Sequence, residues 1–171
     1  QNMMWFHTNR QYAMVTIAYN SLQYLETKDR IRSCLQRVFD SLKKDGYFLL
    51  IVRRIDLSSF KYGKTVAFDW MDKPVVNKEL RLSVGSRLVS YLDTDGSRIL
   101  DERTYRITQQ DGTSETINFT AYKPVIDTPE YVEMLERIGF TVRVSSGYDE
   151  QSEDGNSKEV CFVCRKTDVS T

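Results

Sequence analysis

Cysteine and histidine side chains are the ones best suited to covalent or metal chemistry, and this sequence contains few of them. Cys161 and Cys164 have the C-x-x-C spacing of some metal and redox sites, and His7 is the one histidine. The apolar run around the two cysteines predicts a strand, on which side chains three positions apart point to opposite faces. Without a turn the two sulfur atoms cannot close on one metal ion or on each other. We therefore expect core packing for the cysteines, and a lone histidine with no GxSxG or HExxH spacing disfavours hydrolase chemistry.

The composition is that of an ordinary globular chain. With 171 residues, 40% apolar and 12% aromatic, the sequence can build one domain with a substantial core. The 24 basic and 24 acidic side chains cancel, and neither sign forms a long run, which argues against a nucleic-acid or membrane-surface partner. No apolar stretch approaches membrane-spanning length, and the N-terminus lacks the order of a secretion signal. The expected location is cytoplasmic.

Two apolar runs flank an amphipathic helix near the N-terminus. The runs Tyr12–Ala18 and Tyr47–Val52 do not alternate with polar residues, so we expect strands of a parallel sheet that is covered on both faces. The helix between them should begin at the capping residue Thr27 and run to about Lys44, and Asp45-Gly46 should end it. Its apolar face consists of Ile31, Leu35, Val38, Phe39 and Leu42.

Only eleven residues precede Tyr12, and they cannot supply neighbouring strands for an interior strand. We therefore interpret the chain as the C-terminal half of a larger α/β domain.

The middle of the chain predicts an antiparallel sheet. Shorter segments of mixed alternation are separated there by Asp95-Gly96 and Asp111-Gly112, which are hairpin signals. Neither face of the sheet is cleanly apolar, so it could be a pocket lid, an oligomer contact or a solvated insertion. The expected strands are Thr65–Trp70, Arg81–Leu92, Ile99–Gln109 and Glu115–Tyr122.

A second helix should start at Thr128-Pro129, with the threonine as cap, and stop at Gly139. The strands that follow, Phe140–Ser145 and Lys158–Lys166, are joined by a polar loop without a helix, which predicts an antiparallel hairpin. We expect residues 1–56 and 124–166 to form the sheet-and-helix core and residues 57–123 to form the antiparallel β insertion.

Several segments in this order resemble one enzyme family, the small-molecule class I S-adenosylmethionine-dependent methyltransferases. Leu42–Leu50 is similar to the Leu-Lys-Pro-Gly-Gly step into the family's fifth strand, and Leu135–Val142 is similar to its Leu-x-x-Ala-Gly-Phe step. Tyr12–Val15 and Ile17–Leu25 resemble the fourth strand and its loop, and Asn2-Met3 stands where the family often has Asp-Met. The resemblance implies a Rossmann-like α/β fold and methyl transfer from S-adenosylmethionine to a small molecule.

The same resemblance implies roles for individual residues. Asn2 and Met3 would face the adenine ring, whereas Ala18, Tyr19 and Asn20 would pass beside the methionine moiety, chiefly through backbone atoms. Asn20 could equally be a turn residue that satisfies local amides, and a tyrosine here could be a partly buried aromatic.

For the acceptor, Tyr24, Arg81 and Tyr105 are the candidate binding residues. The insertion that carries Arg81 and Tyr105 would cap the acceptor pocket or join the subunits of an oligomer. No residue is identified as the general base.

The sequence also departs from the family. The glycine-rich cofactor turn and the acidic ribose ligand have no counterpart, and Asn2 and Ala13 replace common aspartates. We therefore expect a partial methyltransferase-like domain that is inactive alone and needs a complementary N-terminal segment or subunit. The alternatives are a noncatalytic partner subunit of a methyltransferase and an unrelated α+β binding module.

Overall fold

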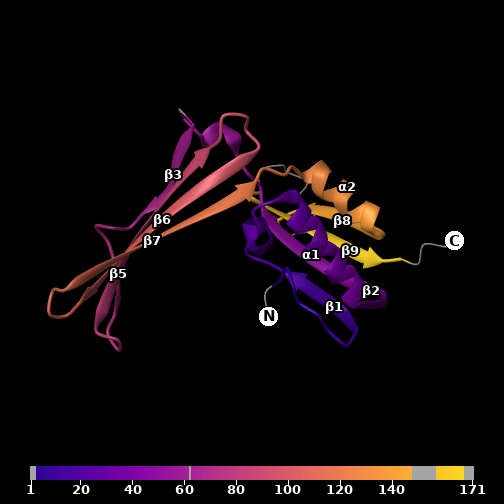
Figure 1. Ribbon diagram of the computed structural model, residues 1–171, viewed down its shortest axis with the longest axis horizontal. Coiled ribbons are helices and arrows are strands. Elements are labelled where there is room, and N and C mark those ends of the chain that lie inside the picture. The colour runs from indigo at the N-terminus through magenta and orange to yellow at the C-terminus, as the bar shows by residue number, and fades with distance from the viewer. Residues whose placement is uncertain (1–2, 62, 148–156, 168–171) are drawn as a thin grey trace. The chain divides into compact units, whose positions relative to one another are not determined.

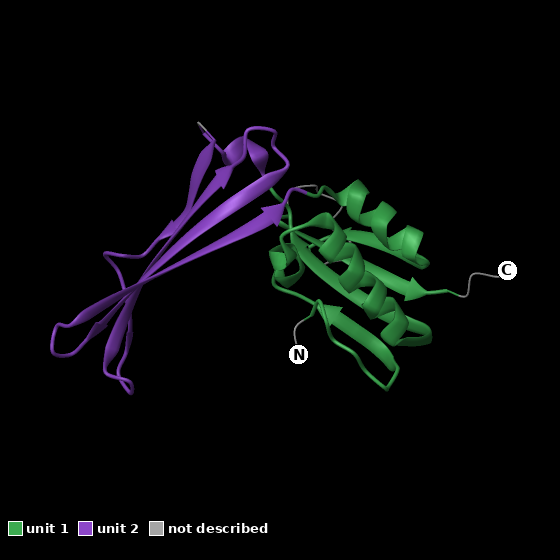
Figure 2. Cartoon of the chain, viewed as in Figure 1, with its two compact units in different colours: residues 1–55, 126–171 green, residues 56–125 purple. Residues whose placement is uncertain are grey.

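The computed structural model describes residues 3–61, 63–147 and 157–167. The chain divides into two compact units, of which unit 1 comprises residues 1–55 and 126–171 and unit 2 comprises residues 56–125 (Figure 2). Each unit has its own sheet, so each is described by itself.

Unit 1 is a four-stranded sheet with its helices on one face (Figure 1). The strand order is β1-β2-β9-β8, in which β1 and β2 are parallel and the other neighbours are antiparallel. The predicted strand, helix, strand unit and the final antiparallel hairpin are thereby confirmed. The elements are β1 (Tyr12–Ile17), the 3-10 helix η1 (Ser21–Leu25), α1 (Lys28–Ser41), β2 (Leu42–Arg53), α2 (Thr128–Ile138), β8 (Phe140–Ser146) and β9 (Glu159–Lys166).

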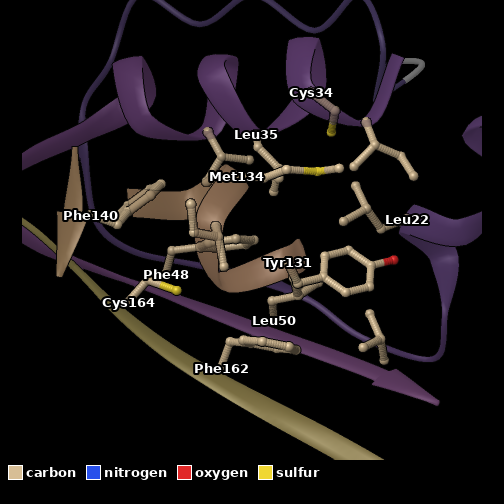
Figure 3. Packing of buried hydrophobic residues seen from close by; sticks show 14 of the residues in the cluster. Leu22, Cys34, Leu35, Phe48, Leu50, Tyr131, Met134, Phe140, Phe162 and Cys164 are labelled. Atoms are coloured by element: carbon tan, nitrogen blue, oxygen red, sulfur yellow. The ribbon is translucent and has the colours of Figure 1, made fainter. Parts of the chain in front are cut away.

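The core of unit 1 lies between the helices and the sheet. Phe48, Phe162 and Tyr131 are almost fully buried, and the Tyr131 and Phe162 ring centroids are 5.6 Å apart (Figure 3). Burial raises the pKa of the Tyr131 phenol above its ordinary value, and a side-chain interaction with Gln23 offsets part of the rise. The helices and strands of unit 1 are therefore held together by one apolar cluster.

Burial on both faces, which the apolar runs predicted, holds for only part of the described sheet. Ile51 of β2, on the face away from the helices, is 8% exposed, but other residues of that face are uncovered. The β2 side chains on the helix side, such as Phe48, are buried, whereas Tyr47 on the opposite face is 43% exposed. Met14 of β1 is 59% exposed. The reason is that α1 and α2 lie on the same face and β1 is an edge strand (Figure 1).

The first helix is shorter than predicted. Thr27 caps α1 as expected, because its side chain accepts a hydrogen bond from the Arg30 backbone N–H. The helix ends at Ser41 and not near Lys44. The Nζ atom of Lys166, on β9, donates to the carbonyl oxygens of Phe39 at 2.9 Å and Leu42 at 3.0 Å. A cation from a distant strand thus satisfies the helix C-terminus, where positive charge is favourable.

Replacing Lys166 by methionine should destabilise unit 1 by roughly 1.5–3 kcal/mol, because hydrogen bonds to a charged donor are lost while the aliphatic stem is kept. Chemical denaturation would measure the change in unfolding free energy. Lys158→Met, at an exposed position just before β9, is the matched control and should change little. Equal midpoints for the two variants would contradict the capping role.

The glycine predicted to stop the first helix lies inside β2. A Cβ atom on Gly46 would lie 2.9 Å from the Lys43 carbonyl oxygen and 3.2 Å from that of Ala13, so only glycine fits without movement. The close approach occurs where the β1–β2 register shifts between Tyr12 and Met14. Gly46 therefore permits β1 to pack against the junction of α1 and β2.

The second helix is capped one residue earlier than predicted. The Asp127 side chain accepts from the Glu130 backbone N–H at 2.8 Å, and Thr128 is the first helical residue. Gly139 ends the helix as predicted, with φ of 113°. The Lys28 Nζ and Glu130 Oε1 atoms are 2.6 Å apart, which links α1 to α2.

All three cysteines are free and buried, as core packing predicted. Burial raises the pKa of the Cys34 thiol to about 11 and that of Cys164 to about 12; Arg37 opposes the first shift and Cys161 adds to the second. The raised pKa of these thiols stabilises the folded protein fully at pH values below 9.0, the ordinary thiol pKa. This stabilisation is lost as the pH rises through the pKa of the folded state.

At pH 8 the native protein should therefore alkylate about a hundredfold more slowly at Cys34 than a free thiol with a pKa of 9 does, since the thiolate is the nucleophile. Mass spectrometry after timed iodoacetamide treatment, with and without urea, would measure this. Rapid native modification of Cys34 or Cys164 would show that these thiols are not in the core.

Unit 2 is an antiparallel sheet, as predicted. The strand order is β3-β5-β6-β7, and β4 also pairs with β5. Gly96 and Gly112, which the hairpin signals contain, have φ of 73° and 85°. The short strand β4 was not predicted. The bounds are η2 (Leu57–Ser59), β3 (Lys64–Asp69), β4 (Val75–Asn77), β5 (Leu82–Leu92), β6 (Arg98–Gln109) and β7 (Ser114–Pro124).

A buried charge lies within unit 2. Asp101 of β6 is 1% exposed, and its carboxylate accepts from the Ser90 hydroxyl at 2.6 Å. The Lys123 Nζ atom, from β7, lies 2.6 Å from the other carboxylate oxygen. Three neighbouring strands therefore share one polar cluster.

Candidate functional site

A strained turn follows β1 at the edge of the sheet where β1 and β2 both end. Open α/β sheets bind ligands at the carboxyl ends of their strands. The Ala18 carbonyl oxygen accepts from the Ser21 N–H at 3.2 Å and from its hydroxyl at 2.8 Å. Between them Tyr19 and Asn20 have φ of 55° and 60°. These are the left-handed values of a type I′ turn, which usually requires glycine or asparagine.

Two side chains connect this turn to the end of β2 by hydrogen bonds. The Asn20 Oδ1 atom accepts a hydrogen bond from the Arg53 backbone N–H. The Gln23 Nε2 atom donates to the Arg53 carbonyl oxygen at 3.2 Å, and Gln23 is only 4% exposed. The backbone N–H and C=O groups of Arg53 in β2 therefore both form hydrogen bonds with the segment that follows β1.

The turn displays one large side chain. Tyr19 is 90% exposed, although it is aromatic and lies beside a core. Tyr24 lies in η1, one helical turn later, and is 39% exposed. Four candidate residues therefore lie within one short stretch of chain after β1: Ala18, Tyr19, Asn20 and Tyr24.

The other candidate residues lie elsewhere. Asn2 falls outside the described residues, and Met3 is half-buried and packs against the core of unit 1. Arg81 and Tyr105 belong to unit 2. Arg81 is exposed in a left-handed conformation just before β5, whereas Tyr105 pairs with Ser86, five residues further along β5, or about 16 Å of strand. Unit 2 does not bring these two residues together.

Tyr105 has aromatic and cationic neighbours that the sequence did not reveal. Its hydroxyl accepts from the Arg103 guanidinium at 3.1 Å, and that guanidinium carbon lies 5.7 Å from the centre of the Phe68 ring. Phe68 in turn stacks on Trp70 with ring centroids 5.0 Å apart. Phe68 and Arg103 were missed because the β3–β5–β6 register, which places them in one row across Leu88, is not visible in the sequence.

Gln23 and Arg53 were also missed as parts of the site. Gln23 is a polar residue between apolar neighbours in the Ser21–Leu25 segment, and this contrast is the signal that could have identified it. Arg53 contributes only backbone atoms to the contacts with Asn20 and Gln23, so its residue type carries no signal for them.

The described part of the chain lacks two kinds of feature. It contains no group of three or more His, Cys, Asp or Glu side chains placed to hold one metal ion. Within the same residues no helix combines the length and apolar composition that crossing a membrane requires.

Comparison with known proteins finds likeness in structure. No family model matches the sequence, and no curated protein matches it. An S-adenosylmethionine-dependent methyltransferase from Clostridium acetobutylicum superposes with a TM-score of 0.78 at 11% identity, over 98% of this chain and 63% of that one. An amino pentose methyltransferase from Micromonospora echinaspora, involved in calicheamicin biosynthesis, gives 0.69 at 15% identity, with coverage of 98% and 63%.

A sugar N-methyltransferase from a Streptoalloteichus species gives a TM-score of 0.71 at 14% identity, over 98% of this chain and 61% of that one. The chain thus spans somewhat less than two thirds of the length of the methyltransferases that it matches. Nearly all of this chain superposes on these structures, so the likeness in fold includes both of its units. The chain has the Rossmann-like α/β fold of the small-molecule class I S-adenosylmethionine-dependent methyltransferases, including an antiparallel β insertion.

Proposed function

We propose that this chain forms the C-terminal part of an S-adenosylmethionine-dependent small-molecule methyltransferase, whose N-terminal part comes from another segment or chain. The observation that carries the proposal is the combination of the methyltransferase fold with an edge strand that has the character of an interior strand. That strand ends in the turn at Tyr19 and Asn20, where a ligand of this fold class would bind.

The edge strand β1 lacks the features that protect a natural edge. Among the described residues it pairs only with β2. Its sequence, Tyr12–Ile17, contains no charged residue and no proline, which natural edge strands commonly use to prevent further pairing. Met14 and Tyr12 are 59% and 45% exposed. This edge is therefore suited to pairing with one more strand.

One face of the sheet is also suited to further packing. Met14 and Tyr47 are paired across β1 and β2, and both are exposed on the face that α1 and α2 leave open. Val163 of β9 is also exposed there. Parallel sheets of α/β proteins carry helices on both faces. A complementary segment would therefore supply a strand for the β1 edge and a helix for this face.

When bound, S-adenosylmethionine would supply a sulfonium methyl group for in-line transfer to a nucleophile on the acceptor, with S-adenosylhomocysteine as the leaving group. The chain's own task would be alignment, since holding two reactants in the correct geometry can account for much of a rate enhancement. The backbone of Ala18, Tyr19 and Asn20 would lie beside the methionine moiety, and Asn2 and Met3 beside the adenine ring.

Tyr24, which lies in η1 just after this turn, would contribute to the acceptor site. Arg81 and Tyr105 of unit 2 would not contact one small acceptor as a pair, because about 16 Å of strand separates them. One structural neighbour is named as an amino pentose methyltransferase and another as a sugar N-methyltransferase, which makes an amino sugar the first acceptor to test.

Calorimetric titration of S-adenosylhomocysteine into the chain alone and into the chain joined to its complementary segment tests the proposal. We expect binding only with the complement, and amide exchange at alternate residues from Met14 to Ala18 should slow when it is present. Met14→Lys should weaken this association, whereas Gln110→Lys, in an exposed turn of unit 2, should not. A complemented protein that binds no cofactor would instead support a noncatalytic partner subunit.

A further inference from the structure

The turn at Tyr19 and Asn20 is costly to form and must be stabilised by its surroundings. A non-glycine residue in the left-handed region is disfavoured because its Cβ atom comes too close to the carbonyl oxygen that follows, and asparagine is the least affected. Here two such residues are consecutive, and Tyr19 cannot offset the cost by packing because it is 90% exposed. Backbone strain of this kind persists where the surrounding contacts determine the conformation, and it is concentrated at functional sites.

The stabilising contacts come from one buried amide and one strand terminus. Gln23 donates to the Arg53 carbonyl oxygen, and the Arg53 N–H donates to Asn20. Gln23 is held between Leu22 and Leu25, which are buried in the unit 1 core. A buried amide that lost its partner would be left unsatisfied, so this geometry is strongly preferred.

We propose that Gln23 and the Arg53 backbone form a clamp that positions the Ala18–Asn20 turn for the methionine moiety of S-adenosylmethionine. This inference rests on the proposed function. In it Gln23 touches neither the cofactor nor the acceptor, and it acts through Arg53 and Asn20 as a positioning residue. Releasing the clamp should let the turn leave its left-handed conformation, so that its backbone no longer meets the cofactor.

If the clamp positions the turn, releasing it should reduce the affinity for a ligand that carries the amino acid part and leave the affinity for adenosine nearly unchanged. In the complemented protein, Gln23→Met keeps the size of the side chain and removes the donor. We expect its affinity for S-adenosylhomocysteine to fall roughly tenfold, as expected for the loss of one or two hydrogen bonds. Its affinity for adenosine, which lacks the amino acid part, should change by less than about twofold.

Two further variants separate positioning from general destabilisation. Gln36→Met makes the same change on the exposed face of α1, where the amide bonds Asp40, and should alter neither affinity. Asn20→Gly tolerates the positive φ but removes the acceptor for Arg53, whereas Asn20→Asp retains an oxygen there. S-adenosylhomocysteine affinity should therefore be lower for Asn20→Gly than for Asn20→Asp.

The outcomes distinguish the two proposals. If Gln23→Met binds both ligands as the unmodified protein does, or loses both equally, the clamp is not a positioning device. If the unmodified, complemented protein binds neither ligand, the proposed function itself is wrong, and the positioning role of the clamp is wrong with it.

Discussion

Replacing Lys123 by methionine should destabilise unit 2 by about 3–5 kcal/mol, because breaking a buried ion pair leaves an uncompensated charge. Asp101 is 1% exposed and the Lys123 side chain only 17% exposed, and their charged atoms are 2.6 Å apart. Ser90 donates to the same carboxylate but carries no charge to balance it. A loss of this size is a large fraction of the stability of a small unit.

Amide hydrogen exchange across β5, β6 and β7 would measure the effect, since it reports on unit 2 without requiring unit 1 to unfold. Lys78→Met, at an exposed position of the same unit, is the control and should leave exchange unchanged. The double variant Asp101→Leu/Lys123→Met should recover most of the lost protection, because apolar replacement of a whole buried pair is often neutral. Unchanged β6 protection in the single variant would show that the pair does not stabilise the sheet.

Replacing Phe162 by alanine should destabilise unit 1 by about 3–5 kcal/mol, because deleting a buried ring removes its transfer free energy and leaves a cavity. Phe162 is fully buried on β9 and contacts the Tyr131 ring. Its register partner on β2 is the buried Leu50, and the cavity would open between the sheet and α2, which carries Tyr131. Chemical denaturation would report the change in unfolding free energy.

Val163→Ala is the matched control for this prediction. Val163 is the next residue of β9, points to the opposite face and is 36% exposed, so its truncation should cost less than about 1 kcal/mol. In the complemented protein the cost should rise, because the proposed segment would cover that face. A large cost for Val163→Ala in the chain alone would show that the open face is already packed.

Much of the fold could be predicted because the local signals agree with the tertiary arrangement. Thr27 caps α1 and Gly139 ends α2 through contacts within a few residues, which sequence spacing reveals. The antiparallel strands of unit 2 are separated by Asp-Gly pairs, which favour tight turns wherever they occur. The α/β fold class could be predicted from the sequence for the same reason.

The larger errors occurred where residues distant in sequence decide the outcome. The end of α1 depends on Lys166, which is more than 120 residues away and satisfies its last carbonyl groups. The apolar character of β1 predicted burial, but burial also requires a neighbour, and the described residues provide one only on the β2 side. Apolar composition shows what a strand can bury and not whether a partner is present.

By itself the sequence determined the order of elements, the two kinds of sheet and the position of the candidate turn after β1, because hydrophobic period, caps and turn residues act over short distances. Only the tertiary structure decided that Gln23 and Asn20 meet the backbone of Arg53, and that Asp101 meets Lys123. Those contacts depend on strand register and on packing across the sheet. No local pattern encodes them, since register is settled by the whole set of side chains that the sheet buries.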